Sequence, residues 1–151
     1  LLFEGKVLVS APVHELNRPG EASAEIIGGN LSLLCHLIGS STFASTEGKI
    51  LFIEEIGERL YHVDRMLLQL KRAGYFQNLA GLILGGFTDC NEASLTIGKT
   101  AYELVAEHTS GTSFPIAFDF PAGHIPNNQP FLFGVKSKLL VNSQEVQLTV
   151  I

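Results

Sequence analysis

Apolar residues along the chain form short blocks separated by polar, glycine-rich and proline-rich segments. Three blocks predict strands: KVLVSAP (6–12), AEIIGG (24–29) and KILFIEE (49–55), with a polar turn over residues 17–20 between the first two. A fourth, LAGLILGGF (79–87), is of the same kind. The third and fourth blocks are apolar at almost every position, which is typical of strands covered on both faces.

Helical periodicity is strongest between residues 60 and 73. Apolar side chains recur there at i, i+3, i+4 and i+7, and Gly74 follows as a C-terminal stop; the residues are Val63, Met66, Leu67 and Leu70. A second helix is predicted over residues 31–39, where Asn30 can serve as the N-cap. The apolar composition of this second helix predicts that it is buried.

The last third of the chain combines one helix with short strands. A helix is expected over residues 92–108, weakened by Gly98, and short strands follow Pro115, with Asn142 and Ser143 turning a terminal hairpin. Helices alternate with strands in the middle of the chain, which favours parallel pairing there and antiparallel pairing at both ends. We therefore predict an α/β fold with a mixed sheet and an extra β layer.

Composition supports one globular domain and excludes several partners. The chain has 151 residues, 46% of them hydrophobic and 17% charged, which is enough to bury a core and too apolar for a disordered tail. No apolar run approaches the roughly 20 residues of a membrane-spanning helix. The formal net charge is -5 and no basic stripe is present, so we expect neither nucleic acid nor membrane as a partner.

No motif indicates a cofactor or a metal. Cys35 and Cys90 lie far apart without CxxC spacing, so we expect reduced packing residues. The Gly-Gly doublets at 28 and 85 are not followed by the residues of a phosphate-binding loop, so we expect no cofactor. Leu1 is not followed by the features of a signal peptide, and the chain begins as if in the middle of a sequence. We expect that it is one domain of a longer protein.

Two carboxylates end the strand KILFIEE. Side chains alternate along a strand, so Glu54 and Glu55 should point to opposite faces, and only one of them can enter a given cleft. A carboxylate in that position can orient a histidine or act as a general base. The alternative is that both side chains simply reach solvent at the strand end.

His124 is the histidine whose surroundings best suit catalysis. It follows Gly123 in the proline-rich loop PAGHIPNNQP (121–130), and such a rigid loop can hold an imidazole in one tautomer. The alternative is an ordinary surface histidine. The sequence offers no nucleophile for this base, because no GxSxG elbow is present and the serines next to Gly39 and Gly111 fit helix exits and turns.

Four segments in sequence order resemble the LD-carboxypeptidase family, which includes muramoyltetrapeptide carboxypeptidases and microcin-immunity peptidases. They are GGNLSLL (28–34), GKILFIEEIGERLYHVDRMLLQLKRAG (48–74), GLILGGFTDC (81–90) and GHIPNNQPFLFG (123–134). The resemblance covers nearly the whole chain and corresponds to the C-terminal domain of the family only. Residues 1–151 are therefore expected to be that domain, with a swivelling β/β/α fold.

The resemblance implies a Ser-His-Glu triad shared between two domains. It assigns the glutamate to Glu54 and the base to His124, and it places the serine in an N-terminal nucleophile domain absent from this chain. The family commonly has Asp where this chain has Glu55. Asn30 and Arg65 recur in the matched motifs, but helix capping and a solvent-facing position are sufficient roles for them.

The activity implied is hydrolysis of the amide to a terminal D-alanine in murein tetrapeptides, as part of peptidoglycan recycling. The resemblance also implies a muropeptide substrate, a cytoplasmic setting and a homodimer for the full-length protein, and an inactive isolated domain. Two other hypotheses belong to different classes: a stand-alone module that binds muropeptides or a protein without catalysis, and a purely structural domain.

Overall fold

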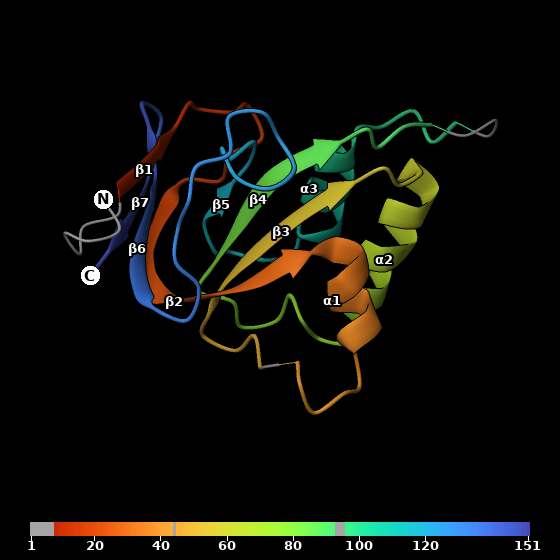
Figure 1. The fold of residues 1–151 in the computed structure, drawn as a ribbon, viewed down its shortest axis with the longest axis horizontal. Coiled ribbons are helices and arrows are strands. Elements are labelled where there is room, and N and C mark those ends of the chain that lie inside the picture. Colours follow the sequence, from red (N-terminus) through yellow and green to blue (C-terminus); the bar gives the residue numbers. More distant parts are fainter. Residues whose placement is uncertain (1–7, 44, 93–95) are drawn as a thin grey trace.

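A mixed sheet with helices on one side forms the domain. The computed structural model describes residues 8–43, 45–92 and 96–151 (Figure 1). Its strands are β1 (Leu8–Ala11), β2 (Gly20–Asn30), β3 (Ile50–Ile56), β4 (Gly81–Thr88), β5 (Ile116–Ala117), β6 (Lys136–Val141) and β7 (Val146–Val150), and its helices are α1 (Leu31–Leu37), α2 (Leu60–Arg72) and α3 (Ala101–His108). The strand order is β1-β7-β6-β2-β3-β4-β5.

Strand β2 connects two differently built halves of this sheet. Its first half, residues 20–25, pairs antiparallel with β6, and its second half, residues 26–30, pairs parallel with β3. Strands β1, β7 and β6 are antiparallel to their neighbours, whereas β2, β3, β4 and β5 run parallel. The predicted parallel middle and antiparallel ends are confirmed.

Two hydrophobic cores lie on the two faces of β3 and β4. On one face, Leu51 and Ile53 pack with α1, α2 and α3. On the other face, Ile50 and Phe52 pack with residues of β1, β6 and β7, which curve over the sheet in Figure 1. The chain thus has three layers, β on β on α, and the expected extra β layer is confirmed.

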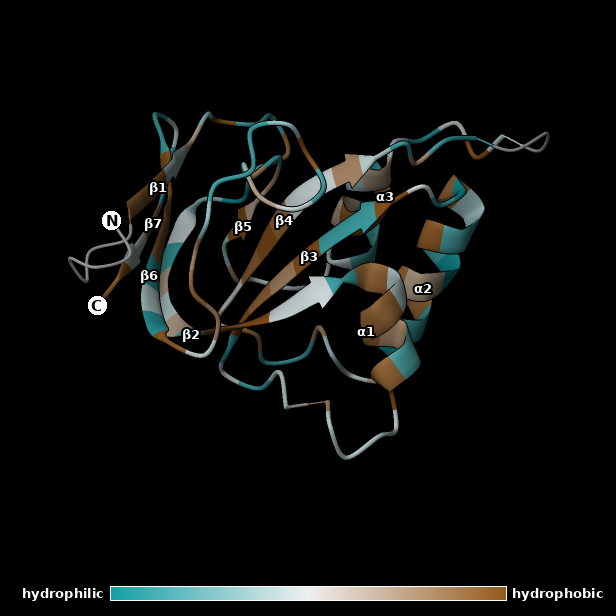
Figure 2. Cartoon of the chain, viewed as in Figure 1, coloured by the Kyte–Doolittle hydropathy of each residue, from teal (hydrophilic) through white to brown (hydrophobic). Residues whose placement is uncertain are grey.

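Helix α2 forms where the periodicity predicts it. Its inward residues Val63, Leu67 and Leu70 are fully buried, and Gly74 follows with a φ of +85°. The hydropathy colours in Figure 2 show the polar side of α2 turned away from the sheet. This helix therefore anchors the helical layer through one apolar face.

Helix α1 differs from its prediction. Asn30 does cap it, because its side chain accepts a hydrogen bond from the Leu33 backbone N–H. However, only the Leu31 and Leu34 face is buried, while Leu33 is 64% exposed. The prediction of a buried helix is wrong for its outer face, since α1 lies on the outside of the helical layer.

Helix α3 is shorter than the predicted helix over 92–108. Thr100 forms a capping box with Glu103, so the helix begins only at residue 101. Gly98 has a φ of +71°, which is incompatible with a continuous helix. Residues 93–95 of the predicted helix lie outside the described residues.

Several strand boundaries also differ from the pattern. The first strand is confirmed over residues 8–11, and its predicted residues 6 and 7 lie outside the described part. Strand β2 begins at Gly20, earlier than expected, and β5 has only two residues. The terminal hairpin of β6 and β7 is confirmed, with the Asn142 side chain accepting hydrogen bonds in its turn.

Across the described ranges, no helix has the length and apolar character needed to cross a membrane.

Candidate active site

The end of β3 places two neighbouring carboxylates on opposite faces of the sheet. Glu54 is 5% exposed and lies on the face of the extra β layer, whereas Glu55 is 2% exposed and lies on the helical face, at the start of α1. The expected alternation is confirmed. The alternative in which both carboxylates reach solvent is wrong, because both are buried and hydrogen-bonded.

A β-bulge in β4 lies directly beside Glu54. Ile53 pairs with Leu84 and Glu55 pairs with Phe87, so Gly85 and Gly86 both lie opposite the single residue Glu54. A bulge of this kind bends a strand and redirects the groups next to it, and bulges are common at active sites. Here the bulge makes room for a loop that crosses the end of β4.

That loop carries His124 and needs both glycines of the bulge. A Cβ at Gly85 would lie 2.4 Å from the carbonyl oxygen of Ala122, and a Cβ at Gly86 would lie 2.3 Å from Cγ2 of Ile125. In place of such clashes, the Gly86 N–H donates to the Ala122 carbonyl over 3.0 Å. The second Gly-Gly doublet therefore allows a close approach of two backbone segments.

Further hydrogen bonds fix the loop on either side of His124. The Thr88 hydroxyl donates to the His124 carbonyl over 2.7 Å, and the Gly123 N–H donates to Oδ1 of Asn128 over 3.2 Å. Gly123 has a φ of +103°, and a Cβ there would lie 2.9 Å from Cβ of Glu54. Only glycine fits this position without displacing the carboxylate.

Glu54 and His124 form a hydrogen-bonded pair. Oε2 of Glu54 lies 2.7 Å from Nδ1 of His124 and 3.3 Å from the His124 backbone N–H. The Glu54 side chain is 6% exposed, whereas the His124 side chain is 56% exposed. The hydrogen bond that His124 donates to Glu54, followed by the negative charge of Glu54, raises the pKa of His124 above the ordinary histidine value.

This geometry leaves Nε2 of His124 free to exchange a proton with another group. A carboxylate that accepts from Nδ1–H fixes the tautomer in which Nε2 is the basic atom, and it stabilises the imidazolium that forms on protonation. The two residues selected from the sequence are therefore brought together in the arrangement of a base and its orienting carboxylate. Their catalytic role stays a prediction.

A cavity of about 390 Å³ lies against the pair. Glu54, Gly123, His124, Asn128 and Gln129 line it together with aromatic side chains, and the remaining lining residues are Gly29, Phe52, Ala122, Pro130, Phe131 and Phe133. Gly29 leaves open space, since a Cβ there would meet no atom within 4 Å. The basic imidazole thus faces a partly apolar hollow.

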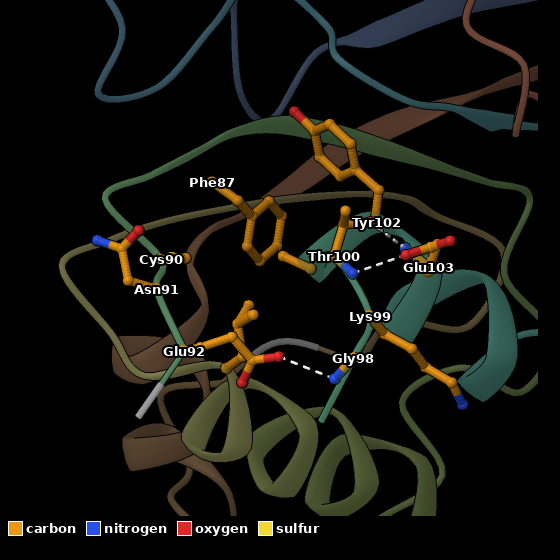
Figure 3. A pocket seen from close by; sticks show the side chains of 11 residues that line it. Phe87, Cys90, Asn91, Glu92, Gly98, Lys99, Thr100, Tyr102 and Glu103 are labelled. Carbon is orange, nitrogen blue, oxygen red and sulfur yellow. Dashed lines mark hydrogen bonds between the residues drawn. The ribbon is translucent and has the colours of Figure 1, made fainter. Parts of the chain in front are cut away.

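A larger cavity, of about 610 Å³, lies between the end of β4 and the start of α3 (Figure 3). Neither Glu54 nor His124 lines it. Its polar groups serve the fold: the Glu92 carboxylate accepts from the Gly98 N–H over 2.8 Å, and the Glu103 carboxylate accepts from the Thr100 N–H over 2.7 Å. The larger cavity therefore offers no comparable catalytic pair.

Within the described residues, the other histidines have no buried carboxylate partner of this kind. His62 pairs with Glu58 and His108 pairs with Asp64, and both carboxylate side chains are partly exposed, at 32% and 40%. Arg65 is exposed and stacks over the ring of Tyr61, in agreement with its expected solvent-facing position. Among the hydrogen bonds of the described residues, none joins a serine to His124.

Metal and cysteine chemistry have little support in the described part of the chain. Within those residues, no group of three or more His, Cys, Asp and Glu side chains is arranged to hold a metal ion. Cys35 and Cys90 are free thiols that pack at the edge of the helical core. Burial, followed by the charge of Glu55, raises the pKa of the Cys35 thiol to about 11, which keeps it protonated near neutral pH.

Sequence reasoning missed the residues that support the pair. Thr88 and Asn128 hold the His124 loop, and Gly85 and Gly86 form the bulge. The signal for the bulge was present in the sequence, since a glycine doublet at the end of an apolar strand indicates a bulge or a close backbone approach. The contacts of Thr88 and Asn128 had no comparable signal, because they depend on the folded loop.

Comparison with known proteins places this geometry in context. Residues 23–139 match the model of the LD-carboxypeptidase C-terminal domain. The "Probable murein peptide carboxypeptidase" of Bacillus subtilis is 33% identical over 129 residues, 85% of this chain and 40% of that protein. The microcin C7 self-immunity protein MccF of Escherichia coli is 26% identical over 133 residues, 86% of this chain and 38% of that protein.

The fold comparison agrees with the sequence comparison. The crystal structure of muramoyltetrapeptide carboxypeptidase from Oxalobacter formigenes superposes with a TM-score of 0.87 and 27% identity, covering 97% of this chain and 50% of that one. The chain thus spans about 40% of the length of the curated relatives it matches, and half of this structural neighbour.

Proposed function

Because the chain belongs to the LD-carboxypeptidase family, of which it matches the C-terminal domain, we propose that it supplies the base and the orienting carboxylate of a serine-type LD-carboxypeptidase. The observation that carries the proposal is the 2.7 Å hydrogen bond between buried Glu54 and exposed His124. Such a pair is two-thirds of a triad, and it requires a nucleophile from elsewhere.

In the proposed reaction, His124 accepts a proton at Nε2. A serine hydroxyl of an N-terminal nucleophile domain attacks the carbonyl of the scissile amide and gives its proton to Nε2. The tetrahedral intermediate then collapses to an acyl-serine, and Nε2 returns the proton to the departing amine of D-alanine. Water repeats the sequence in the second half, with its proton passing to Nε2 and then to the serine oxygen.

Glu54 acts on His124 in both halves of this reaction. Its Oε2 accepts from Nδ1–H, so the proton-accepting lone pair stays on Nε2. When Nε2 is protonated, the carboxylate stabilises the imidazolium across a hydrogen bond whose Glu54 end is buried.

The proposed substrate is a murein tetrapeptide, and the bond cleaved joins an L-configured centre of the diamino acid to the terminal D-alanine. The names of the relatives support this class of substrate, since they include a murein peptide carboxypeptidase and a muramoyltetrapeptide carboxypeptidase. The isolated chain is proposed to be inactive because it carries the base without the serine. A cytoplasmic location, a role in peptidoglycan recycling and a homodimer of the full-length protein belong to the same proposal.

The experiment that tests the proposal is D-alanine release from a muramoyl tetrapeptide by the full-length protein. We expect His124→Ala to lower kcat by about 10⁴- to 10⁶-fold, as loss of a triad base does. His36→Ala is the matched control, because His36 is an exposed histidine on α1 and should leave the rate unchanged. A near-normal rate for His124→Ala would contradict the assignment of the base.

A mass measurement tests the proposed domain organisation separately. This chain has a mass of 16.3 kDa. We expect the protein made by its source cell to have about twice that mass, because the relatives are more than twice as long as the matched part. A natural product of about 16 kDa would favour the alternative of a stand-alone binding module.

A further inference from the structure

Glu55 is a buried carboxylate that the proposed reaction does not use. It is 2% exposed, and none of the ion pairs among the described residues includes it. Its oxygens instead accept three hydrogen bonds: from Asn30 Nδ2 at 2.7 Å, from the Ser32 backbone N–H at 2.8 Å and from the Ile56 backbone N–H at 2.9 Å. A buried charge is unfavourable unless such donors compensate it, so this arrangement needs a geometric explanation.

The three donors come from three different elements. Asn30 is the last residue of β2, Ser32 lies in the first turn of α1, and Ile56 ends β3. Asn30 also caps α1, since its Oδ1 accepts from the Leu33 N–H and from the Ser32 hydroxyl. Glu55 therefore ties the ends of two parallel strands to the start of a helix.

The hydrogen bonds of Glu55 lie next to Glu54, the carboxylate that the proposed mechanism uses. Asn30 is the register partner of Glu54 in the β2–β3 ladder. On the other side of β3, the bulge of Gly85 and Gly86 leaves Glu54 without a regular partner in β4. The backbone of Glu54 is thus held in register only on the β2 side, where Glu55 fastens the strand end.

We infer that Glu55 is a positioning residue for the catalytic pair: by holding the end of β3 to Asn30 and α1, it keeps the Glu54 carboxylate within hydrogen-bonding distance of His124. The inference rests on the proposed function for its kinetic consequence, but its structural part concerns only this chain. A carboxylate suits the position because all three of its partners are donors. An amide side chain would turn an NH₂ group towards at least one of them.

Histidine titration by NMR in this chain tests the inference without the nucleophile domain. The carboxylates whose charges act on His124 are Glu54, directly, and Glu55, from the other face of the sheet. Asn30→Ser removes the amide donor to Glu55 while keeping a side-chain N-cap and every charge. We expect the pKa of His124 to fall towards the ordinary histidine value, because the Glu54–His124 hydrogen bond loosens.

A second variant removes the Glu55 charge together with its hydrogen bonding. Glu55→Gln should lower the pKa of His124 further than Asn30→Ser does, because the Glu55 charge also acts on His124. Glu58→Gln keeps the Glu55 hydrogen bonds and both of the charges that act on His124, so it should leave that pKa unchanged. Folding of each variant is checked by the dispersion of its backbone amide spectrum, and if Glu55→Gln does not fold, Asn30→Ser decides alone. An unchanged or higher pKa of His124 in Asn30→Ser would overturn the inference.

The kcat and KM of the full-length protein distinguish a positioning role from a purely structural one, because a purely structural role would leave kcat per folded molecule unchanged. We expect Glu55→Gln to lower kcat by about 100-fold with little change in KM, since small displacements of catalytic groups cost about that much. Glu55→Asp keeps the charge and should recover most of the rate. If kcat per folded molecule were normal in Glu55→Gln while His124→Ala was inactive, the proposed function would stand and this inference would fail.

Discussion

Glu54 and Glu55 are adjacent carboxylates that are buried on opposite faces of β3. Their hydrogen-bond partners differ in kind. Glu54 is hydrogen-bonded to one titratable partner, the imidazole of His124, which lines a cavity. Glu55 meets donors that do not titrate: two backbone N–H groups and the amide of Asn30. Burial and charge alone therefore do not distinguish the two carboxylates. The proposed assignment of a catalytic role to one of them rests on the nature and exposure of its hydrogen-bond partner.

The same contrast explains why the two carboxylates need different surroundings. In the proposed mechanism the Glu54 side admits substrate, and the cavity there is bordered by the His124 loop, which packs on the bulge at Gly85 and Gly86. The Glu55 side is covered by α1, whose Ser32 backbone N–H donates to the carboxylate. If the inference about Glu55 is correct, its hydrogen bonds on one face of β3 hold the proposed catalytic carboxylate on the other face in place.

Among the substitutions that test the difference between the two faces of β3, Glu54→Gln is expected to lower kcat the most. The neutral amide keeps the shape of the side chain but cannot stabilise the imidazolium, and it can favour the wrong tautomer of His124, so kcat should fall by about 10⁴-fold. Initial rates of D-alanine release by the full-length protein measure this effect. The fall expected for Glu55→Gln is about 100-fold smaller. Equal losses in the two variants would remove the distinction between a catalytic and a positioning carboxylate.

An intermediate effect is expected from Gly123→Ala. The added Cβ would lie 2.9 Å from Cβ of Glu54, and a φ of +103° strains any side chain, so we expect a loss of about 100-fold in kcat together with reduced stability. Gly48→Ala is the matched control. Its φ of +66° is also positive, but a Cβ there would meet no atom within 4 Å.

Thermal unfolding and rate measurements on both glycine variants test this prediction. Gly48→Ala should lose stability, by about 1–2 kcal/mol, and keep its rate. If both variants kept the wild-type rate, the close packing of Gly123 against Glu54 would have no catalytic consequence.

The smallest effect is expected from Thr88→Val. The change removes the 2.7 Å hydrogen bond from the Thr88 hydroxyl to the His124 carbonyl, which should cost about 1 kcal/mol of stability and lower kcat a few-fold. Thr46→Val removes a hydrogen bond of the same type, 3.0 Å long, to the Tyr75 carbonyl away from the cavity. Denaturant titration should give similar losses of stability for both, and only Thr88→Val should change the rate.

Much of the fold could be predicted because burial patterns are local. The apolar run of β3 and the periodicity of α2 both led to the observed elements, and the switch from parallel to antiparallel pairing followed from the order of helices and strands. Helix α3 was predicted too long because Gly98 and the Thr100 cap outweigh the helix-forming residues before them. The exposed face of α1 was missed because an apolar sequence does not reveal what covers it.

The sequence allowed the two central residues of the candidate site to be selected, but not the residues that support them. Residues Glu54 and His124 stood out through their place after a strand and in a rigid loop, and the family resemblance selected between Glu54 and Glu55. Glu54 and His124 are 70 positions apart in the sequence, so no local pattern reveals their contact. The support from Asn30 and Thr88 depends on three-dimensional proximity that no local pattern records.

The pH dependence of kcat/KM, compared with the NMR titration of His124 in the same full-length protein, tests the central claim most directly. A general base works only when it is neutral, and the raised pKa of His124 places the acidic limb of the profile above the ordinary value of about 6.5. We predict that the kinetic and NMR pKa values coincide, and that both move to lower pH in Glu54→Gln. An acidic limb that stays in place while the His124 titration moves would contradict the assignment of His124 as the base.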